Sequence, residues 1–213
     1  MLHVVWDWNG TLFDDLHVVV DAVNEVMGQA DLPPITMEDY RDRYARPVRR
    51  FYENLYGRPI GDAEWLELDH VFHEAYRWRL HEAGLREDAA AALDAIDAIG
   101  GTQSILSMWR HEELLELVAE LGITDRFVLV DGLKGPGGGR KAPHLEVHLE
   151  RIDHGWEDTV LIGDAVDDAD AALAHECRVV LIDNGSHPRT VLEQVGAPVA
   201  TDLLEALSLA GLD

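Results

Sequence analysis

The sequence contains little cysteine and little lysine, and each shortage narrows what the protein can do. Among its 213 residues Cys177 is the single cysteine, so an internal disulfide framework is excluded and a reducing compartment is favoured. Lysine occurs only as Lys134 and Lys141. The search for a catalytic lysine therefore has two candidates.

Positive charge is scarce as a whole. The chain carries 41 acidic and 17 basic residues, which gives a formal net charge of −24. Such a surface repels phosphate backbones and anionic lipids, so we expect neither nucleic acid nor a membrane as a partner. An anionic substrate remains compatible with this charge if a cation lies between the protein and the ligand.

The chain also lacks long apolar runs. No run approaches the ~20 apolar residues that span a bilayer, and the first ten residues, MLHVVWDWNG, do not have the pattern of a signal peptide. We therefore expect a soluble, cytoplasmic protein. Hydrophobic residues nevertheless make up 47% of the chain, enough for a buried core, and the length fits one domain or a core with a small insertion.

Short apolar runs alternate with segments of helical periodicity, a pattern that predicts an α/β fold with a doubly wound parallel sheet. Segment 15–83 has no strand-like run, so we expect a helical lobe inserted into a core formed by residues 1–14 and 84–213. The glycine-rich run 135–139 predicts a mobile loop. The predicted strands are 3–6, 102–106, 127–130, 159–162 and 178–182, and the clearest predicted helices are 112–121, 143–152 and 167–176.

Carboxylates follow two of these strands. Asp7 comes directly after the first strand, before a turn in which Gly10 and Thr11 are suited to hold a phosphate or the loop itself. The strand 159–162 leads into Gly163-Asp164-Ala165-Val166-Asp167-Asp168. The carboxyl ends of parallel strands are where α/β sheets bind ligands, and clustered carboxylates suit Mg²⁺. The alternative is that these residues are solvated loop and helix-capping residues.

Two further residues make the pattern more specific. Ser107 is predicted to close the strand 102–106, and Lys141 stands just before the helix predicted from residue 143. With Asp7 and the Gly163-Asp164 motif, this ordered set resembles the haloacid dehalogenase superfamily of phosphohydrolases. The similarity is greatest to the phosphoglycolate-phosphatase-like members, which have a helical C1-type cap, and it covers nearly the whole chain.

The resemblance implies roles for these residues. Asp7 would be the nucleophile that forms an aspartyl-phosphate. Mg²⁺ would be held by Asp7, the backbone carbonyl of Asn9, Asp164 and Asp168, and Asp167 is an alternative to Asp168. In the same comparison Ser107 binds a phosphoryl oxygen and Lys141 pairs with the phosphate and with Asp7, whereas Lys134 is the less suitable lysine.

Asn9 departs from the family pattern. Phosphatases of the family have an aspartate here, which protonates the leaving oxygen and later activates water, and asparagine does neither. General acid–base catalysis is typically worth about 10²–10⁴-fold. Three explanations stay open: a natural but slow enzyme, an enzyme for substrates such as acyl or aryl phosphates whose leaving group needs no proton, or a variant inactivated for crystallography.

The resemblance also implies that substrate selection lies in the cap. Arg46 and Arg49 are candidate substrate-binding residues because they belong to a local run of arginines on an acidic chain. The alternative is a solvated helix face on which the arginines pair with neighbouring carboxylates. Trp8 and Trp109 are expected to line the opening of the site.

The sequence thus predicts a Mg²⁺-dependent phosphatase that acts on the phosphate monoester of a small metabolite. The alternatives are an impaired or inactive binding or sensor protein that keeps the fold, and a phosphoryl transferase or phosphomutase. Dehalogenase chemistry is disfavoured, since the Gly163-Asp164 motif and the Gly10-Thr11 pair suit phosphate better.

Overall fold

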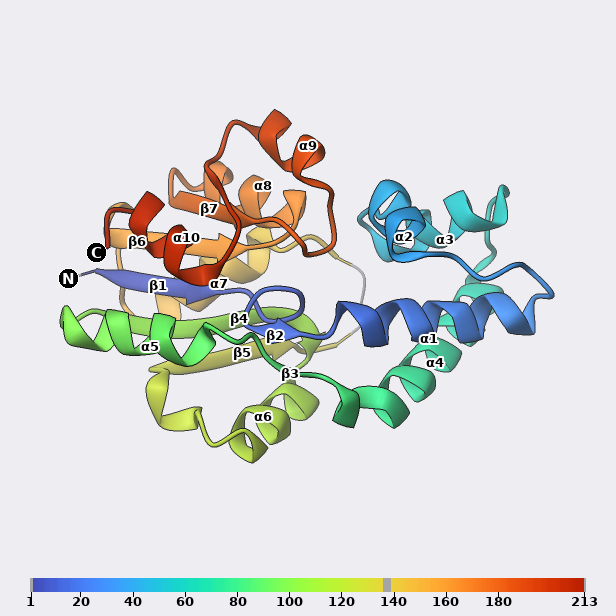
Figure 1. The fold of residues 1–213 in the computed structure, drawn as a ribbon, viewed down its shortest axis with the longest axis horizontal. Coiled ribbons are helices and arrows are strands. Elements are labelled where there is room, and N and C mark those ends of the chain that lie inside the picture. Colours follow the sequence, from blue (N-terminus) through green and yellow to red (C-terminus); the bar gives the residue numbers. More distant parts are fainter. Residues whose placement is uncertain (1, 136–138, 213) are drawn as a thin grey trace.

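The computed structural model describes residues 2–135 and 139–212. Its main sheet has six parallel strands in the order β5-β4-β1-β6-β7-β8 (Figure 1). The first strand therefore lies inside the sheet, between β4 and β6. The strands of this sheet are β1 (His3–Trp6), β4 (Thr102–Arg110), β5 (Leu129–Leu133), β6 (Thr159–Gly163), β7 (Arg178–Ile182) and β8 (Val199–Ala200).

Helices cover both faces of the sheet, which explains why its strands are apolar in consecutive positions. Successive side chains point to opposite faces, so Val4 and Trp6 belong to one hydrophobic cluster and Val5 to another. Helices α5 (Ala89–Ala98), α6 (His111–Glu120) and α10 (Leu203–Leu209) pack in the first cluster. Helices α7 (Ala142–Arg151), α8 (Val166–Ala174) and α9 (Arg189–Leu192) pack in the second.

Four helices form a second lobe beside the sheet, which we call the cap (Figure 1). They are α1 (Leu16–Gln29), α2 (Met37–Arg43), α3 (Val48–Tyr56) and α4 (Asp62–Arg79). The cap has its own hydrophobic cluster, which includes Val23, Val26, Phe51 and Leu55. The helices are therefore held together by their own apolar contacts as well as by contacts with the sheet.

The two chain segments that join the cap to the core pair with each other. Strand β2 (Phe13–Asp14) runs antiparallel to β3 (Gly84–Leu85), with Phe13 opposite Leu85. Because the chain leaves the core at β2 and returns at β3, this short ribbon fixes where the cap begins over the end of β1.

The structure confirms the α/β fold and corrects some boundaries. Strand β4 continues to Arg110, so Ser107 lies within it and does not close it. The register of β4 against β5 shifts between Leu106 and Arg110, and this irregularity made the end of the strand hard to place. Strand β5 begins two residues later than predicted, and the loop predicted at 135–139 falls largely on residues outside the described ranges.

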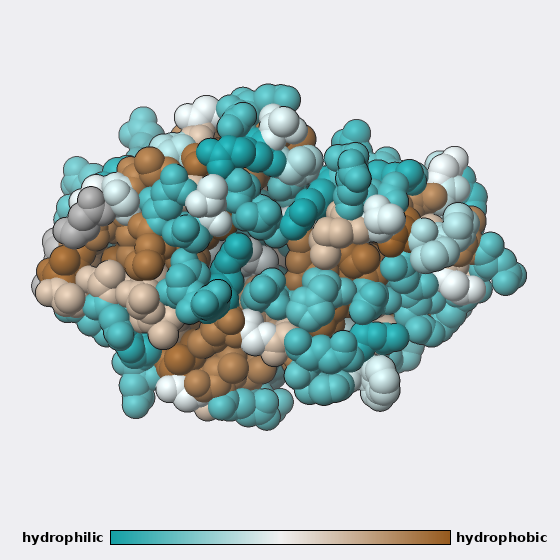
Figure 2. Space-filling model, viewed as in Figure 1, coloured by the Kyte–Doolittle hydropathy of each residue, from teal (hydrophilic) through white to brown (hydrophobic). Residues whose placement is uncertain are grey.

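In the described ranges, none of the helices combines the length and the apolar character needed to span a membrane. The face drawn in Figure 2 is largely hydrophilic, as the excess of acidic residues predicts. Hydrophobic residues reach this surface in patches, and one patch lies on the cap near its junction with the core.

Candidate active site

The candidate site lies at the carboxyl ends of β1, β4 and β6. The chain runs from β1 to β4 and β5 on one side and then to β6 on the other side of β1. Loops that leave neighbouring strands in opposite directions open a crevice at such a point, where α/β proteins bind ligands. Asp7 directly follows the last residue of β1, and Asp164 directly follows the last residue of the neighbouring strand β6.

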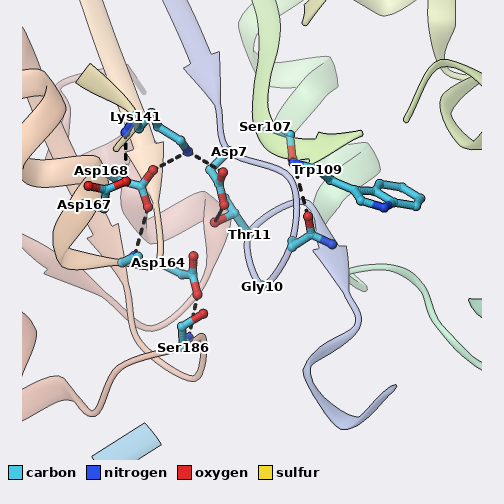
Figure 3. Close-up of polar contacts among 12 residues, drawn as sticks. Asp7, Gly10, Thr11, Ser107, Trp109, Lys141, Asp164, Asp167, Asp168 and Ser186 are labelled. Carbon is cyan, nitrogen blue, oxygen red and sulfur yellow. Dashed lines mark hydrogen bonds and ion pairs between the residues drawn. The ribbon is translucent and has the colours of Figure 1, made fainter. Parts of the chain in front are cut away.

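Three carboxylates and one lysine form the centre of the site (Figure 3). Asp7, Asp164 and Asp168 are buried, and one oxygen of each lies within 4.8 Å of the others. The ammonium group of Lys141 donates hydrogen bonds to Oδ1 of Asp7 and Oδ1 of Asp168. Lys141 is itself 3% exposed. Residues 134 positions apart in the sequence thus form a buried ion pair.

The electrostatics of this cluster favour a further cation. Burial raises the pKa of Asp7, and the nearby charges of Asp168 and Asp164 raise it further, against the opposing effect of Lys141. Burial and Asp168 also raise the pKa of Asp164. Burial alone would lower the pKa of Lys141, but the carboxylates of Asp168 and Asp7 raise it, so the lysine stays charged. One ammonium group therefore faces three carboxylates, and negative charge is in excess.

Backbone groups and close packing fix the carboxylates. The Ser186 N–H donates to Oδ2 of Asp164 at 2.5 Å, and the Ala165 N–H donates to Oδ2 of Asp168 at 3.0 Å. A Cβ atom at Gly163 would lie 2.3 Å from the carboxyl carbon of Asp168, and one at Gly10 would lie 2.6 Å from Oδ2 of Asp164. Gly10 also has a φ of +73°, a conformation that favours glycine. Neither position therefore has room for a side chain unless the neighbouring carboxylate moves.

Two hydroxyl groups, those of Thr11 and Ser107, contact the loop that follows β1. The Thr11 hydroxyl donates to Oδ2 of Asp7 at 3.3 Å. Ser107 is buried, its Oγ accepts the Trp109 N–H at 3.0 Å, and its hydroxyl donates to Oδ1 of Asn9 at 3.4 Å. Figure 3 shows Ser107 and Thr11 on opposite sides of the loop that follows β1.

Asn9 contacts a carboxylate that the sequence analysis did not single out. Its Nδ2 donates to Oδ2 of Asp15 at 2.7 Å and to the Tyr76 hydroxyl at 3.0 Å. Tyr76 in turn donates to Oδ2 of Asp15 at 2.7 Å, and the Gly10 N–H donates to Oδ1 at 2.9 Å. Asp15 is 1% exposed, and burial raises its pKa while these hydrogen bonds lower it in part. The closeness of Asp15 in the sequence to Asp7 and Asn9 was the available signal.

The structure distinguishes between the alternatives that the sequence left open. The ammonium group of Lys134 lies 3.6 Å from Asp131 and is largely exposed, so this lysine is outside the carboxylate cluster. Asp167 accepts the backbone N–H of Lys141 at 2.9 Å and thereby fixes the lysine. Asp168, and not Asp167, belongs to the cluster that is able to hold a cation.

A cavity of about 550 Å³ opens above the cluster, between the core and the cap. Asp7, Asn9, Ser107 and Lys141 contribute to its floor, and Arg46 and Trp109 contribute to its wall. Trp109 therefore lies where it was expected.

Two residues that were expected at the site lie elsewhere. Arg49 does not line the cavity, because its guanidinium is engaged within the cap by Asp62 at 2.7 Å and by the carbonyl of Ile60. Arg49 instead pairs with neighbouring carboxylates, which was the alternative to substrate binding. Trp8 is fully buried and stacks on Phe13, so it supports the loop and does not line the cavity.

A cap arginine that the sequence analysis passed over joins the two lobes. Arg41 of α2 donates from Nε to the carbonyl of Gly185 at 3.0 Å and from Nη2 to the carbonyl of Asn184 at 2.7 Å. These carbonyls immediately precede Ser186, which binds Asp164. Nothing in the local sequence distinguishes Arg41 from its neighbours, since the contact spans 144 positions.

The donor set fits a hard divalent cation. Asp7, Asp164 and Asp168 offer carboxylate oxygens only, and they are buried and in mutual reach. Mg²⁺ prefers a few carboxylates together with water and substrate phosphate oxygens. The excess of negative charge among these same carboxylates also favours a bound cation.

Comparison with known proteins agrees with this geometry. Residues 1–176 match the family model of haloacid dehalogenase-like hydrolases. No curated protein matches the sequence.

Several solved structures share the fold across the whole chain. A haloacid dehalogenase-like hydrolase from Streptococcus pneumoniae superposes with a TM-score of 0.84 at 18% identity and covers 98% of this chain and 97% of its own. A predicted phosphatase from Clostridium acetobutylicum has a TM-score of 0.86 at 14% identity, with 99% and 98% covered. A predicted phosphoglycolate phosphatase from Haemophilus somnus has a TM-score of 0.80 at 16% identity, with 97% and 96% covered. At these identities the likeness shows the fold.

Proposed function

Because the chain belongs to the haloacid dehalogenase-like hydrolases, we propose that it hydrolyses the phosphate monoester of a small metabolite, with Mg²⁺ as cofactor. The observation that carries the proposal is the buried cluster of Asp7, Asp164 and Asp168 paired with Lys141 at the floor of the cavity. Structural neighbours named as phosphatases support the same substrate class.

Asp7 is the nucleophile in this proposal. One of its carboxylate oxygens attacks phosphorus, the bond between phosphorus and the ester oxygen breaks, and an aspartyl-phosphate forms. Lys141 holds Asp7 in place and pairs with the phosphoryl group. The Ser107 hydroxyl, which donates to Asn9 and lines the same cavity as Asp7, binds a phosphoryl oxygen. Water then attacks phosphorus and releases phosphate with both oxygens of Asp7 restored.

The metal ligands in this proposal are the carboxylates of Asp7, Asp164 and Asp168 and the backbone carbonyl of Asn9. When bound, Mg²⁺ supplies positive charge that screens the repulsion between the phosphate and the carboxylates. The Ser186 and Ala165 N–H groups hold two of these carboxylates without consuming their remaining oxygens.

The test is Mg²⁺-dependent release of inorganic phosphate from p-nitrophenyl phosphate and from 2-phosphoglycolate, with Asp7→Ala as the blank. We expect release from the aryl ester above the blank and its loss on chelation by EDTA. Equal rates for the wild type and Asp7→Ala would refute the proposal, provided that circular dichroism shows both to be folded.

Asn9 favours a second candidate, a protein that binds a phosphorylated ligand without turning it over. The amide offers no titratable proton, and general acid–base help is worth about 10²–10⁴-fold. Calorimetric titration distinguishes the two functions: Mg²⁺-dependent binding of the phosphate ester with no phosphate release indicates the binding protein.

A further inference from the structure

Aromatic rings from three cap helices and from the core form part of the wall of the cavity above Asp7. Helix α2 contributes Tyr40, α3 contributes Phe51 and Tyr52, and α4 contributes Trp65, Phe72 and Tyr76. The core adds Trp109, whose ring meets that of Tyr76 edge to face at 5.8 Å. Figure 3 shows the Trp109 ring extending from the strand that carries Ser107. Such walls bind planar apolar groups through burial and ring contacts.

The volume of the cavity is large for a two-carbon phosphate ester. At about 550 Å³ it lies within the range of pockets that enclose drug-sized ligands. A small ester with two anionic groups, such as 2-phosphoglycolate, would leave the aromatic wall without a partner. A substrate with a ring fills the space and uses that wall.

Four side chains of the cavity also carry polar atoms that lack a hydrogen-bond partner among the described residues. They are Nε of Arg46, the hydroxyl of Tyr52, Nδ1 of His73 and Nε1 of Trp109. An unpaired buried polar atom destabilises the protein, and native proteins usually provide a partner. Oxygen atoms on a bound ring are suitable partners for the donors in this set.

Asn9 restricts the leaving group independently of the wall. With an amide where the family has a carboxylic acid, the ester oxygen departs without a proton. A phenol ionises near pH 10, as tyrosine does, whereas water ionises about six units higher. A phenolic oxygen is therefore released as the anion far more easily than the oxygen of an alkyl ester.

We infer that the substrate is an aryl phosphate, in which the phosphate is carried on a phenolic oxygen and the ring bears a polar substituent. This inference rests on the proposed function and names the substrate class of the same site. The Asp7 carboxylate forms a bond to phosphorus, the bond from phosphorus to the aryl oxygen breaks, and the electron pair leaves with the aryloxide, which is protonated by solvent. Water then cleaves the aspartyl-phosphate, and its two protons leave with the phosphate product as dihydrogen phosphate.

The test compares four esters on the wild type: phenyl, 1-naphthyl and benzyl phosphate, and 2-phosphoglycolate. Benzyl phosphate has the ring but an alkyl oxygen, so it separates ring binding from leaving-group chemistry. We expect kcat/KM for 1-naphthyl phosphate to exceed that for benzyl phosphate by roughly 10²-fold, the lower limit for the missing acid. We also expect 2-phosphoglycolate to be the poorest of the four.

Trp65→Ala tests the wall, and Trp78→Ala is the matched control. Trp78 is on the same helix but is 70% exposed and does not line the cavity. We expect Trp65→Ala to raise KM for 1-naphthyl phosphate at least about threefold, and more than for phenyl phosphate, because ring contacts are lost. Trp78→Ala should leave both values unchanged.

The outcomes distinguish a failure of the aryl phosphate inference from a failure of the proposed phosphatase function. Equal kcat/KM for benzyl and 1-naphthyl phosphate, a preference for 2-phosphoglycolate, or no effect of Trp65→Ala would overturn the aryl phosphate inference and leave the phosphatase in place. No release from any of the four esters above the Asp7→Ala blank would overturn both, and that result is distinct because it does not depend on the ring.

Discussion

The side-chain amide of Asn9 donates a hydrogen bond to the carboxylate of Asp15, with Nδ2 2.7 Å from Oδ2. Asp15 is buried and also accepts from Tyr76 and from the Gly10 N–H. A carboxylate at position 9 would face this buried carboxylate in place of a donor. Asparagine at this position is therefore matched to its surroundings, which is an argument against a simple inactivating change.

This relationship predicts that Asn9→Asp alone is destabilising. Two buried carboxylates in contact repel each other, and Oδ2 of Asp15 loses one of its two donors, at a cost of about 1–3 kcal/mol. We expect urea unfolding to show a lower free energy of unfolding at pH 8, and a smaller deficit at pH 5, where the pair holds a proton. The double variant Asn9→Asp/Asp15→Asn restores a donor and an acceptor and should recover most of the loss. A single variant as stable as the double one would contradict the matched pair.

Removal of the Lys141 ammonium group should strongly reduce both stability and activity. Lys141→Met leaves Asp7 and Asp168 buried without their partner, and the loss of one partner of a buried pair costs about 3–5 kcal/mol. We expect phosphate release to fall by at least ~10²-fold and the melting temperature to fall as well. Lys134→Met is the matched control, since Lys134 is exposed and outside the cluster. The same loss in both variants would count against a special role for Lys141.

Stabilisation by Mg²⁺ should depend on pH. Burial raises the pKa of Asp7 and of Asp164 in the folded, metal-free protein, so the unfolded state loses these protons first as pH rises above the ordinary carboxyl range near 4. The folded state then binds more protons than the unfolded state, and the contribution of these groups to stability falls with rising pH.

A cation that neutralises the carboxylates removes this penalty. We therefore expect a larger Mg²⁺-induced increase in melting temperature at pH 8 than at pH 5 by differential scanning fluorimetry, and almost none in Asp164→Asn at either pH. An increase of equal size at both pH values would show that these carboxylates do not bind the metal in competition with protons.

Close packing against Asp168 makes Gly163 sensitive to a single methyl group. A Cβ atom would lie 2.3 Å from the carboxyl carbon of Asp168, whereas at Gly28 of α1 it would meet nothing within 4 Å. We expect Gly163→Ala to destabilise the protein by about 1–3 kcal/mol and to reduce phosphate release at least ~10-fold through displacement of the carboxylate. Gly28→Ala should stabilise it by up to ~1 kcal/mol as an exposed helix position. Chemical denaturation and a phosphate assay measure both, and wild-type activity in Gly163→Ala would contradict the packing argument.

The contact of Arg41 with the carbonyls of Asn184 and Gly185 predicts a role in holding the cap over the site. Arg41→Ala removes both hydrogen bonds, and we expect KM to rise about three- to tenfold with a change of less than ~1 kcal/mol in stability. Arg43→Ala on the same helix is the control, because Arg43 pairs only with Asp39 at the cap surface among the described residues. Steady-state kinetics that show the same KM for both variants would remove the contact from the mechanism.

The fold was predictable because local patterns of hydrophobic residues specify its strands and helices. Apolar runs such as the one that precedes Asp164 specify buried parallel strands, and the helical periodicity between them specifies the covering layers. The structure confirms this α/β arrangement. Strand ends were less predictable, since the irregularity between Leu106 and Arg110 depends on pairing with β5 and leaves no mark in the sequence of β4 alone.

The candidate site divides in the same way. The sequence determined which groups are available. They are the carboxylates at the ends of two strands, the one suitable lysine and the asparagine at position 9, and each was recognisable from its place beside a predicted strand or helix. The family resemblance implied that Lys141 pairs with Asp7, but the other contacts among these groups were decided by the tertiary structure. Lys141 joins Asp7 and Asp168, Asp15 pairs with Asn9, and the cap helices present rings to the cavity, through contacts between residues far apart in the chain. The physical reason is that such contacts depend on the relative positions of packed elements, which no single segment encodes.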